Sequence, residues 1–196
     1  MLWSAASSLL MSIPIHSNLL AYSDRLQARQ QEDITGIVIH CTETPDLATA
    51  REFGERIHYA ESQTGNSGHF YIDVDGRTEQ YVPLQRIAHH VNGHNENSIG
   101  IELVNRGRYP HWLHSQLQQM TSAYPPGQIA ALRMLLQQLQ QQLPTLSWIA
   151  GHQALDQRLV NASDDPKVKV RRKMDPGPLF PWQQIMQDSA LERIDQ

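Results

Sequence analysis

Residues 171–182 read RRKMDPGPLFPW, and the prolines at positions 176, 178 and 181 prevent this stretch from forming a helix. Because a residue that precedes proline also prefers extended backbone, the segment is expected to be extended. In extended backbone, side chains two residues apart project to the same side, which places Lys173 beside Asp175 and turns Met174 away. Such a pair can be a weak surface ion pair. Alternatively, Asp175 is a metal ligand, and its partner ligands must come from elsewhere in the chain.

The composition indicates one globular domain. The chain has 196 residues, of which 40% are hydrophobic and 18% are charged, and a net charge of −4. These values suit a single domain with a substantial core. The basic residues form only one cluster, at 167–173, and this distribution argues against a nucleic-acid-binding protein. The single cysteine, Cys41, excludes an internal disulfide and a zinc site made of thiolates alone.

The N-terminal residues MLWSAASSLLMSIPI are apolar in patches, but no lysine or arginine occurs before Arg25. No apolar run in this region is long enough to span a bilayer. We therefore expect no integral membrane segment and no working signal peptide. Residues 1–34 are expected to be an N-terminal lead, and residues 35–196 the functional domain.

Two short apolar segments each end on a histidine. Residues 34–42 read ITGIVIHCT, which predicts a buried strand ending near His40, and residues 146–152 read LSWIAGH, which predicts a strand ending on His152. In α/β sheets, functional sites gather at the carboxyl ends of the strands. His40 and His152 are therefore candidate site residues.

The spacing of apolar residues predicts three main helices. The first begins at a cap, Thr44 or Asp46, and its predicted apolar stripe consists of Leu47, Ala50, Phe53, Ile57 and Ala60. The second covers 129–143 and ends before Pro144. The third closes the chain over 180–194, which read FPWQQIMQDSALERI.

Further strands are predicted between the first two helices. Residues 69–82 form a hairpin about an Asp-Gly turn at 75–76, and residues 87–90, IAHH, form a short strand. Residues 98–105, SIGIELVN, alternate in polarity, which predicts a half-buried strand whose Glu102 faces away from the core. Residues 106–126 are rich in Tyr, His, Trp and Gln, and are expected to form a functional loop or a short insertion over the site.

His40, His152 and Asp175 offer two imidazole nitrogens and a carboxylate oxygen from distant parts of the chain. This is the ligand set of a catalytic zinc site, which keeps a fourth position for water. A histidine at a strand end, however, is more often a hydrogen-bonded structural residue. The residue pattern alone leaves both alternatives open.

Six segments, in this order and at these separations, resemble one enzyme family. They are IVIHCT, SGHFYID, AHH, NSIGIELVN, AGHQAL and KMDPGPLFPW. The family is that of the zinc-dependent N-acetylmuramoyl-L-alanine amidases of type 2, to which peptidoglycan recognition proteins and phage amidases are related. The resemblance covers about residues 35–187. It implies an α/β fold with a central mixed β-sheet flanked by helices.

The resemblance also implies roles for individual residues. One zinc ion per chain would be bound by His40, His152 and Asp175, and the catalytic residues would be Glu102 and Lys173. Family enzymes hydrolyse the amide that joins the lactyl group of N-acetylmuramic acid to L-alanine of the stem peptide. In such a reaction, the carboxylate of Glu102 would transfer a proton and the cation of Lys173 would stabilise an oxyanion. The implied partner is peptidoglycan or a muropeptide, in bacterial cell-wall degradation or recycling.

Two further residues are candidates for substrate binding. His90 matches a recurrent histidine of the family and would line the substrate groove; a hydrogen-bonded role in the core is its alternative. Trp112 could stack on sugar or peptide, and its alternative is packing within its own loop.

Two other functions are open to this sequence. A cysteine amidase would use Cys41 as nucleophile, but Cys41 follows His40 on a strand, so the two side chains point to opposite faces. A non-catalytic peptidoglycan-binding module would lack a zinc ligand, whereas all three are present here. We expect a monomer in the cell envelope or periplasm, with the cytoplasm as the alternative location.

Overall fold

The computed structural model describes residues 12–187 and 189–195. Its strands are β1 (Ile15–Ser17), β2 (Gly36–Cys41), β3 (Phe70–Ile72), β4 (Thr78–Gln80), β5 (Ser98–Leu103), β6 (Trp148–Gly151), β7 (Leu159–Asn161), β8 (Lys169–Arg171) and β9 (Glu192–Ile194). Its α-helices are α1 (Leu47–Gly54), α2 (Pro126–Gln142), α3 (His152–Leu155) and α4 (Trp182–Met186). Short 3₁₀ helices lie at Ser23–Arg25 and Gln31–Asp33.

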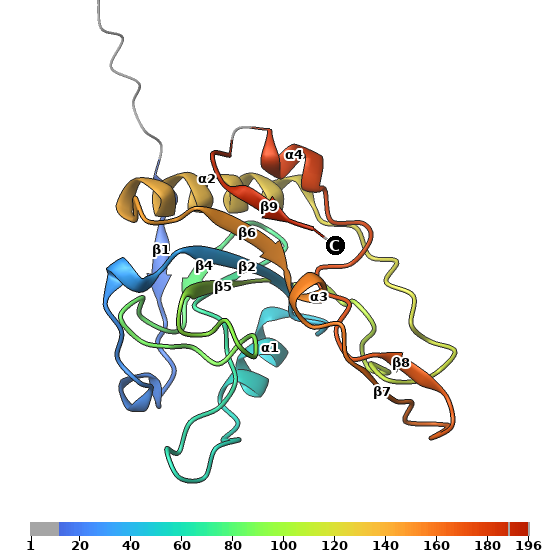
Figure 1. The fold of residues 1–196 in the computed structure, drawn as a ribbon. Helices are drawn as coiled ribbons and strands as arrows, with labels where there is room; N and C mark the ends of the chain where they lie inside the picture. Colours follow the sequence, from blue (N-terminus) through green and yellow to red (C-terminus); the bar gives the residue numbers. More distant parts are fainter. Residues whose placement is uncertain (1–11, 188, 196) are drawn as a thin grey trace, which may run out of the picture.

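A mixed sheet forms the centre of the fold, with the strand order β1-β4-β3-β5-β2-β6-β9 (Figure 1). Strands β3 and β4 are antiparallel, and the other neighbouring strands of this sheet run parallel. The hairpin β7–β8 forms a separate, two-stranded sheet. The predicted central mixed sheet flanked by helices is confirmed.

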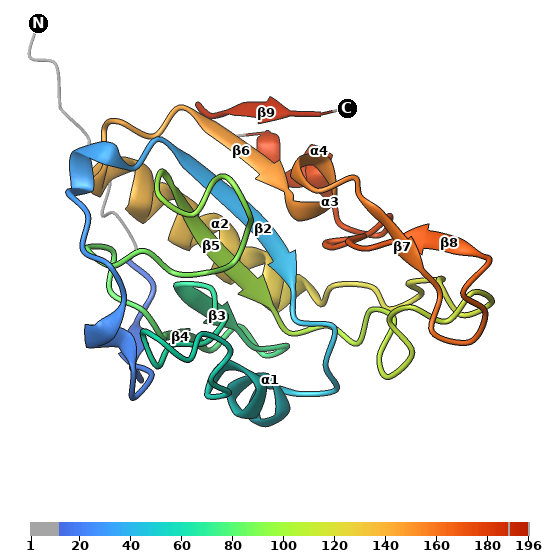
Figure 2. The ribbon, with the colours of Figure 1, turned by 60° about the horizontal axis from the view of Figure 1, so that its bottom comes forward.

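Helices cover both faces of the sheet. Helix α2 lies against one face and α1 on the other, as Figures 1 and 2 show from two directions. On the α2 side, Ile37 and Ile39 of β2 share a buried cluster with Leu132 and Leu135 of the helix. Burial of this apolar surface is the main stabilising contribution to the fold. Because side chains alternate along β2, His40 projects from the opposite face, toward α1.

Several predicted elements are confirmed with small changes at their ends. Strands β2 and β6 and helix α2 lie where the apolar patterns placed them. The hairpin turns at Gly76, whose φ of +91° is a backbone conformation that glycine adopts without steric cost. Asp46 caps α1 by accepting a hydrogen bond from the Thr49 N–H at 2.7 Å.

The first helix is shorter than predicted. It ends at Gly54, so Ile57 and Ala60 lie outside it, and Ile57 is 45% exposed. The residues that follow form a loop closed by a bridge between Tyr59 and Thr64. The predicted apolar stripe was wrong beyond the second turn, because glycine at 54 is a poor helix former and the loop makes its own contacts.

Two predictions about the middle strands were wrong. Residues 87–90 join no ladder; Ile87 donates one hydrogen bond to the Gln27 carbonyl, and a single bridge joins Ala28 to Arg86. Strand β5 is buried on both faces instead of one, because it lies between β3 and β2 at the centre of the sheet. Glu102 therefore faces a site within the protein, where it is only partly exposed.

The chain's two ends also differ from expectation. The predicted closing helix is limited to α4, and Glu192–Ile194 instead forms the edge strand β9 beside β6. Strand β1 lies in the expected N-terminal lead but pairs with β4, so part of that lead belongs to the folded sheet. The predictions for residues 1–11 lie outside the described residues.

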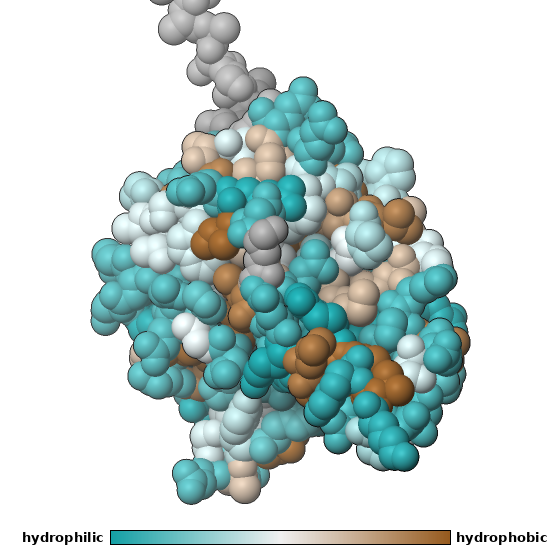
Figure 3. Space-filling view, turned by 45° about the vertical axis from the view of Figure 1, so that its right-hand side comes forward, coloured by the Kyte–Doolittle hydropathy of each residue, from teal (hydrophilic) through white to brown (hydrophobic). Residues whose placement is uncertain are grey.

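Some large hydrophobic side chains are exposed, among them Leu159 and Leu179. On the face shown in Figure 3, hydrophobic residues gather in small groups among hydrophilic ones. No helix within the described ranges combines the length and apolarity needed to cross a membrane.

Candidate metal centre

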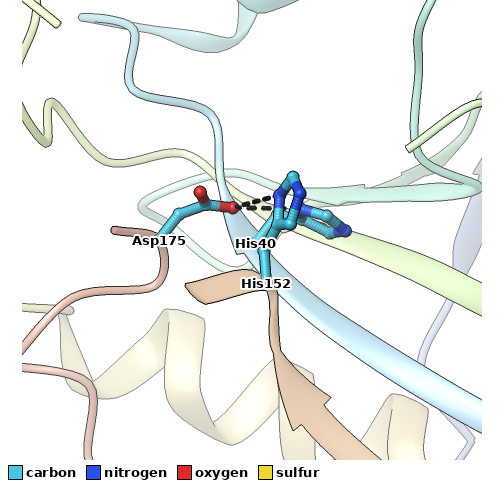
Figure 4. Close-up of side chains that lie close together, drawn as sticks. All are labelled: His40, His152 and Asp175. Carbon is cyan, nitrogen blue, oxygen red and sulfur yellow. Dashed lines mark hydrogen bonds and ion pairs between the residues drawn. The ribbon is translucent and has the colours of Figure 1, made fainter. Parts of the chain in front are cut away.

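Neighbouring parallel strands bring the two candidate histidines together. His40 lies near the carboxyl end of β2, and His152 follows β6 directly as the first residue of α3. In the register of these strands, Ile39 lies beside Gly151, so the residues that follow them emerge side by side. Asp175 comes from the loop after β8, and its carbonyl accepts a hydrogen bond from the Gln153 N–H at 2.9 Å. Figure 4 shows the three side chains pointing toward one another.

The donor atoms of these side chains converge on one point. His40 Nδ1 lies 3.0 Å and His152 Nδ1 lies 3.1 Å from the same oxygen, Asp175 Oδ2. One ligand atom from each residue can be chosen so that all three lie within 4.8 Å of one another. The residues predicted from distant sequence positions therefore form one cluster.

This cluster fits a zinc ion. All three residues are buried, and His152 Nε2 and Asp175 Oδ1 have no hydrogen-bond partner among the described residues. Buried polar atoms are rarely left unpaired, so these two orphaned atoms mark an incomplete set of interactions. Two imidazoles and one carboxylate are a donor set that catalytic zinc takes.

The protonation states of His40 and Asp175 are also those that a metal requires. Burial lowers the pKa of His40 to about 4, and the nearby carboxylate of Asp175 only partly opposes this shift. Burial also acts to raise the pKa of Asp175, but His152 and His40 outweigh it and hold that pKa well below its usual range. A neutral imidazole and an ionised carboxylate can bind a cation without first losing a proton.

Glu102 lies next to the cluster. In the register of β2 and β5 it is paired with His40, and its Oε1 is 4.0 Å from His40 Nδ1. Burial, with a smaller effect of the Asp175 charge, raises the pKa of Glu102 to about 8. The ammonium of Lys173 partly opposes that rise. A carboxyl group with a pKa near neutrality is suited both to accepting and to donating a proton.

Lys173 and Asp175 line the same groove, whereas Met174 packs against the main core cluster, as extended backbone predicts. Within the described residues, the Lys173 ammonium has neither a hydrogen-bond acceptor nor an ion-pair partner. Its charge is therefore available to a molecule bound in the groove.

Both candidate substrate-binding residues line this groove. His90 also contacts the metal cluster, because its Nδ1 lies 3.0 Å from His40 Nε2. Trp112 donates a hydrogen bond from Nε1 to the Glu43 carbonyl at 3.1 Å and meets Phe53 edge to face. His90 thus combines exposure to the groove with a contact to a candidate ligand.

Cys41 projects to the other side of the sheet. It belongs to the buried cluster beneath α2, which confirms that it and His40 point to opposite faces. Burial raises the pKa of its thiol well above the usual range, so the reactive thiolate is disfavoured.

A buried ion pair beside the site was not predicted. Glu43 and Arg108 line the groove, and their side chains are bound to each other through two hydrogen bonds, of 2.7 and 2.8 Å. They are far apart in the chain, and neither stands in a pattern of its own. The sequence offered one indication that Glu43 lies near the site: it stands shortly after His40, beyond the end of β2.

Comparison with known proteins agrees with this geometry. Residues 30–178 match the family described as N-acetylmuramoyl-L-alanine amidase. N-acetylmuramoyl-L-alanine amidase AmiD of Escherichia coli (strain K12) is 35% identical over 119 residues, which are 57% of this chain and 37% of AmiD. The chain thus spans little more than a third of that relative's length.

Solved structures share the fold. The endolysin amidase LysCS from Clostridium intestinale URNW has a TM-score of 0.65 at 19% identity, over 93% of this chain and 99% of that one. A complex of AmiD from E. coli with anhydro-N-acetylmuramic acid-L-Ala-D-gamma-Glu-L-Lys has a TM-score of 0.59 at 26% identity, over 79% of this chain and 57% of that one. Because the family match covers most of this chain, the chain belongs to the type 2 N-acetylmuramoyl-L-alanine amidase family.

Proposed function

We propose that this protein is a zinc-dependent hydrolase that cleaves the amide between N-acetylmuramic acid and L-alanine of the peptidoglycan stem peptide. The observation that carries the proposal is the convergence of His40, His152 and Asp175, with two buried atoms that lack partners among the described residues. Glu102 and Lys173 line the groove beside it, so the groups that the reaction needs lie together.

The three ligands would hold one zinc ion per chain. When bound, zinc supplies a Lewis acid that polarises the amide carbonyl and lowers the pKa of a water molecule. Glu102 would accept the proton of the attacking water and deliver it to the departing amine nitrogen. Lys173 would stabilise the negative charge that develops on the carbonyl oxygen, because its ammonium lines the groove and has no hydrogen-bond or ion-pair partner among the described residues.

The nature of the substrate is supported by the relatives. AmiD from E. coli was solved with a substrate made of anhydro-N-acetylmuramic acid and a short peptide. The groove of this protein offers aromatic side chains, such as Phe53 and Trp112, beside cations, such as Arg56 and Lys173. These groups suit a molecule that joins a sugar to an acidic peptide. We propose that His90 and Trp112 contact that substrate, that the protein acts as a monomer, and that it works in the cell envelope.

Removal of zinc tests the proposal. We expect the purified protein to contain about one zinc ion per chain, and treatment with a chelator to abolish release of the peptide from a muramoyl-peptide. Added zinc should restore the activity. Full activity in protein shown by elemental analysis to be metal-free would contradict the proposed mechanism.

Replacement of Cys41 by alanine separates this function from that of a cysteine amidase. The variant loses a small buried side chain, which should cost about 1 kcal/mol in the free energy of unfolding. Its turnover on the same muramoyl-peptide should stay close to that of the parent. A folded, zinc-loaded variant that loses several orders of magnitude in turnover would instead identify Cys41 as the nucleophile.

A further inference from the structure

The guanidinium of Arg108 is buried where three loops of the site meet. We propose that Arg108, held by Glu43, is a positioning residue that fixes the segment bearing Lys173 and Asp175 relative to the strand that bears His40. This inference rests on the proposed zinc-dependent function, because its effect would be exerted on the zinc ligands.

Arg108 is joined first to the loop that follows β2. Its Nε donates to Glu43 Oε1 at 2.7 Å, and its Nη2 donates to Glu43 Oε2 at 2.8 Å. The backbone N–H of Arg108 adds a third hydrogen bond to Glu43 Oε1, at 3.1 Å. A two-pronged pairing of this kind fixes orientation as well as distance. Glu43 stands only three residues after His40, so the pair is anchored close to a candidate ligand.

Arg108 is joined next to the segment that carries the third ligand. Its Nη1 donates to the Arg171 carbonyl at 3.0 Å, and its Nη2 donates to the Arg172 carbonyl at 3.3 Å. These carbonyls immediately precede Lys173, and Asp175 follows two residues later. One side chain therefore bridges the exit of β2 and the segment that presents both the ammonium and the carboxylate.

The loop after β5 completes the junction. The Thr42 N–H donates to the Leu103 carbonyl at 3.0 Å, and the Thr44 N–H donates to the Asn105 carbonyl at 3.2 Å. These bonds join the exits of β2 and β5, the strands that carry His40 and Glu102. Arg108 stands at the end of this joined pair, so it connects both strand exits to the third segment.

The local backbone is built around this contact. Glu43 has a φ of +47°, an uncommon conformation for a residue other than glycine, and its carbonyl is held by Trp112. Gly107 has a φ of +50°, and a Cβ there would lie 2.7 Å from Glu43 Cγ. The chain thus adopts unusual backbone at two positions where Glu43 meets Arg108.

The hydrogen-bonding capacity of Arg108 is fully used within the protein. Its remaining Nη1 donor bonds Gln118 Oε1 at 3.0 Å, so all five N–H groups of the guanidinium have acceptors. Its exposed fraction is 3%, and that of Glu43 is 6%. A cation so enclosed is suited to holding backbone in place and not to contacting a substrate.

The test is the zinc affinity and kinetics of Arg108→Lys. Lysine keeps the charge, but its compact ammonium cannot reproduce a fork that joins Glu43 to two carbonyls. We expect the zinc Kd to rise by roughly 10-fold to 100-fold and kcat to fall by a similar factor, as when groups that orient metal ligands are removed. KM should change less than kcat. Zinc titration followed by thermal unfolding gives the Kd even for a weakly stable variant.

Two further variants separate positioning from general stability. Glu43→Gln breaks the charge pair but leaves Arg108 able to reach the Arg171 and Arg172 carbonyls, so its zinc Kd should rise less than that of Arg108→Lys. Arg51→Lys is the matched control, because Arg51 also pairs with a glutamate, Glu55, and donates to two backbone carbonyls, those of Asn18 and Leu19, but does not line the groove. It should lower the unfolding temperature and leave the zinc Kd of the folded protein unchanged.

The possible results separate failure of this inference from failure of the proposed function. Parental zinc Kd and kcat in folded Arg108→Lys overturn the inference, as does an equal change in Arg51→Lys. Failure of Arg108→Lys to fold at any zinc concentration would make the pair a purely structural one and overturn it too. If the parent protein itself binds no zinc, the proposed function fails, which is distinguishable from failure of this inference alone.

Discussion

His152→Ala is expected to raise the zinc Kd by more than about 100-fold, which exceeds the usual effect of removing a group that only orients a ligand. The variant would leave His40 and Asp175 as the ligands found in the described residues, and zinc in catalytic sites is normally held by three protein ligands. Turnover at limiting zinc should fall at least as much, because a metal-free site lacks the Lewis acid.

Competition with a chromophoric chelator measures this Kd, and elemental analysis measures the zinc retained after dialysis. His16→Ala is a suitable control, because His16 is an exposed histidine on β1. It should bind zinc as the parent does. Retention of one tightly held zinc ion by folded His152→Ala would show that His152 is not a ligand, and that the ion sits elsewhere.

The candidate ligands could be predicted from the sequence because each depends on local pattern. His40 and His152 each follow an apolar run of strand length, and parallel neighbours bring such ends together. Asp175 lies in a segment whose backbone is fixed by prolines, so its direction relative to Lys173 follows from alternation alone. Their assignment to zinc, however, depended on the family resemblance.

The Glu43–Arg108 pair could not be predicted in this way. Its two members are 65 residues apart, and the pairing depends on three loops meeting in space. A glutamate after a strand and an arginine in a polar loop are ordinary surface residues in sequence terms. Only the fold shows that both are buried.

The short edge strands could not be predicted from the sequence either. β1 and β9 are each three residues long, which is too short for an alternating pattern to stand out. Residues 180–194 contain enough apolar positions to suggest a helix, but pairing with β6 competes with helix formation near the end of the chain. The choice between the two was made by tertiary contacts and not by local preference.

Glu102→Gln is expected to keep its zinc and to lose turnover by roughly 10²-fold to 10⁴-fold, the usual contribution of a general acid–base group. Glutamine preserves the shape of the side chain on β5 but cannot accept a proton. Burial and the charge of Asp175 raise the pKa of Glu102 to about 8, and carboxyl groups with perturbed pKa values are frequent at functional sites.

The decisive comparison is bound zinc and kcat measured on the same preparation with the same muramoyl-peptide. Glu32→Gln serves as the control, since Glu32 is exposed in the 3₁₀ helix at Gln31–Asp33, and it should match the parent in both quantities. Loss of zinc from Glu102→Gln would point to a role in holding the metal cluster, because Glu102 Oε1 lies 4.0 Å from His40. Near-normal turnover with zinc in place would mean that another group transfers the proton, and that Glu102 only lines the groove.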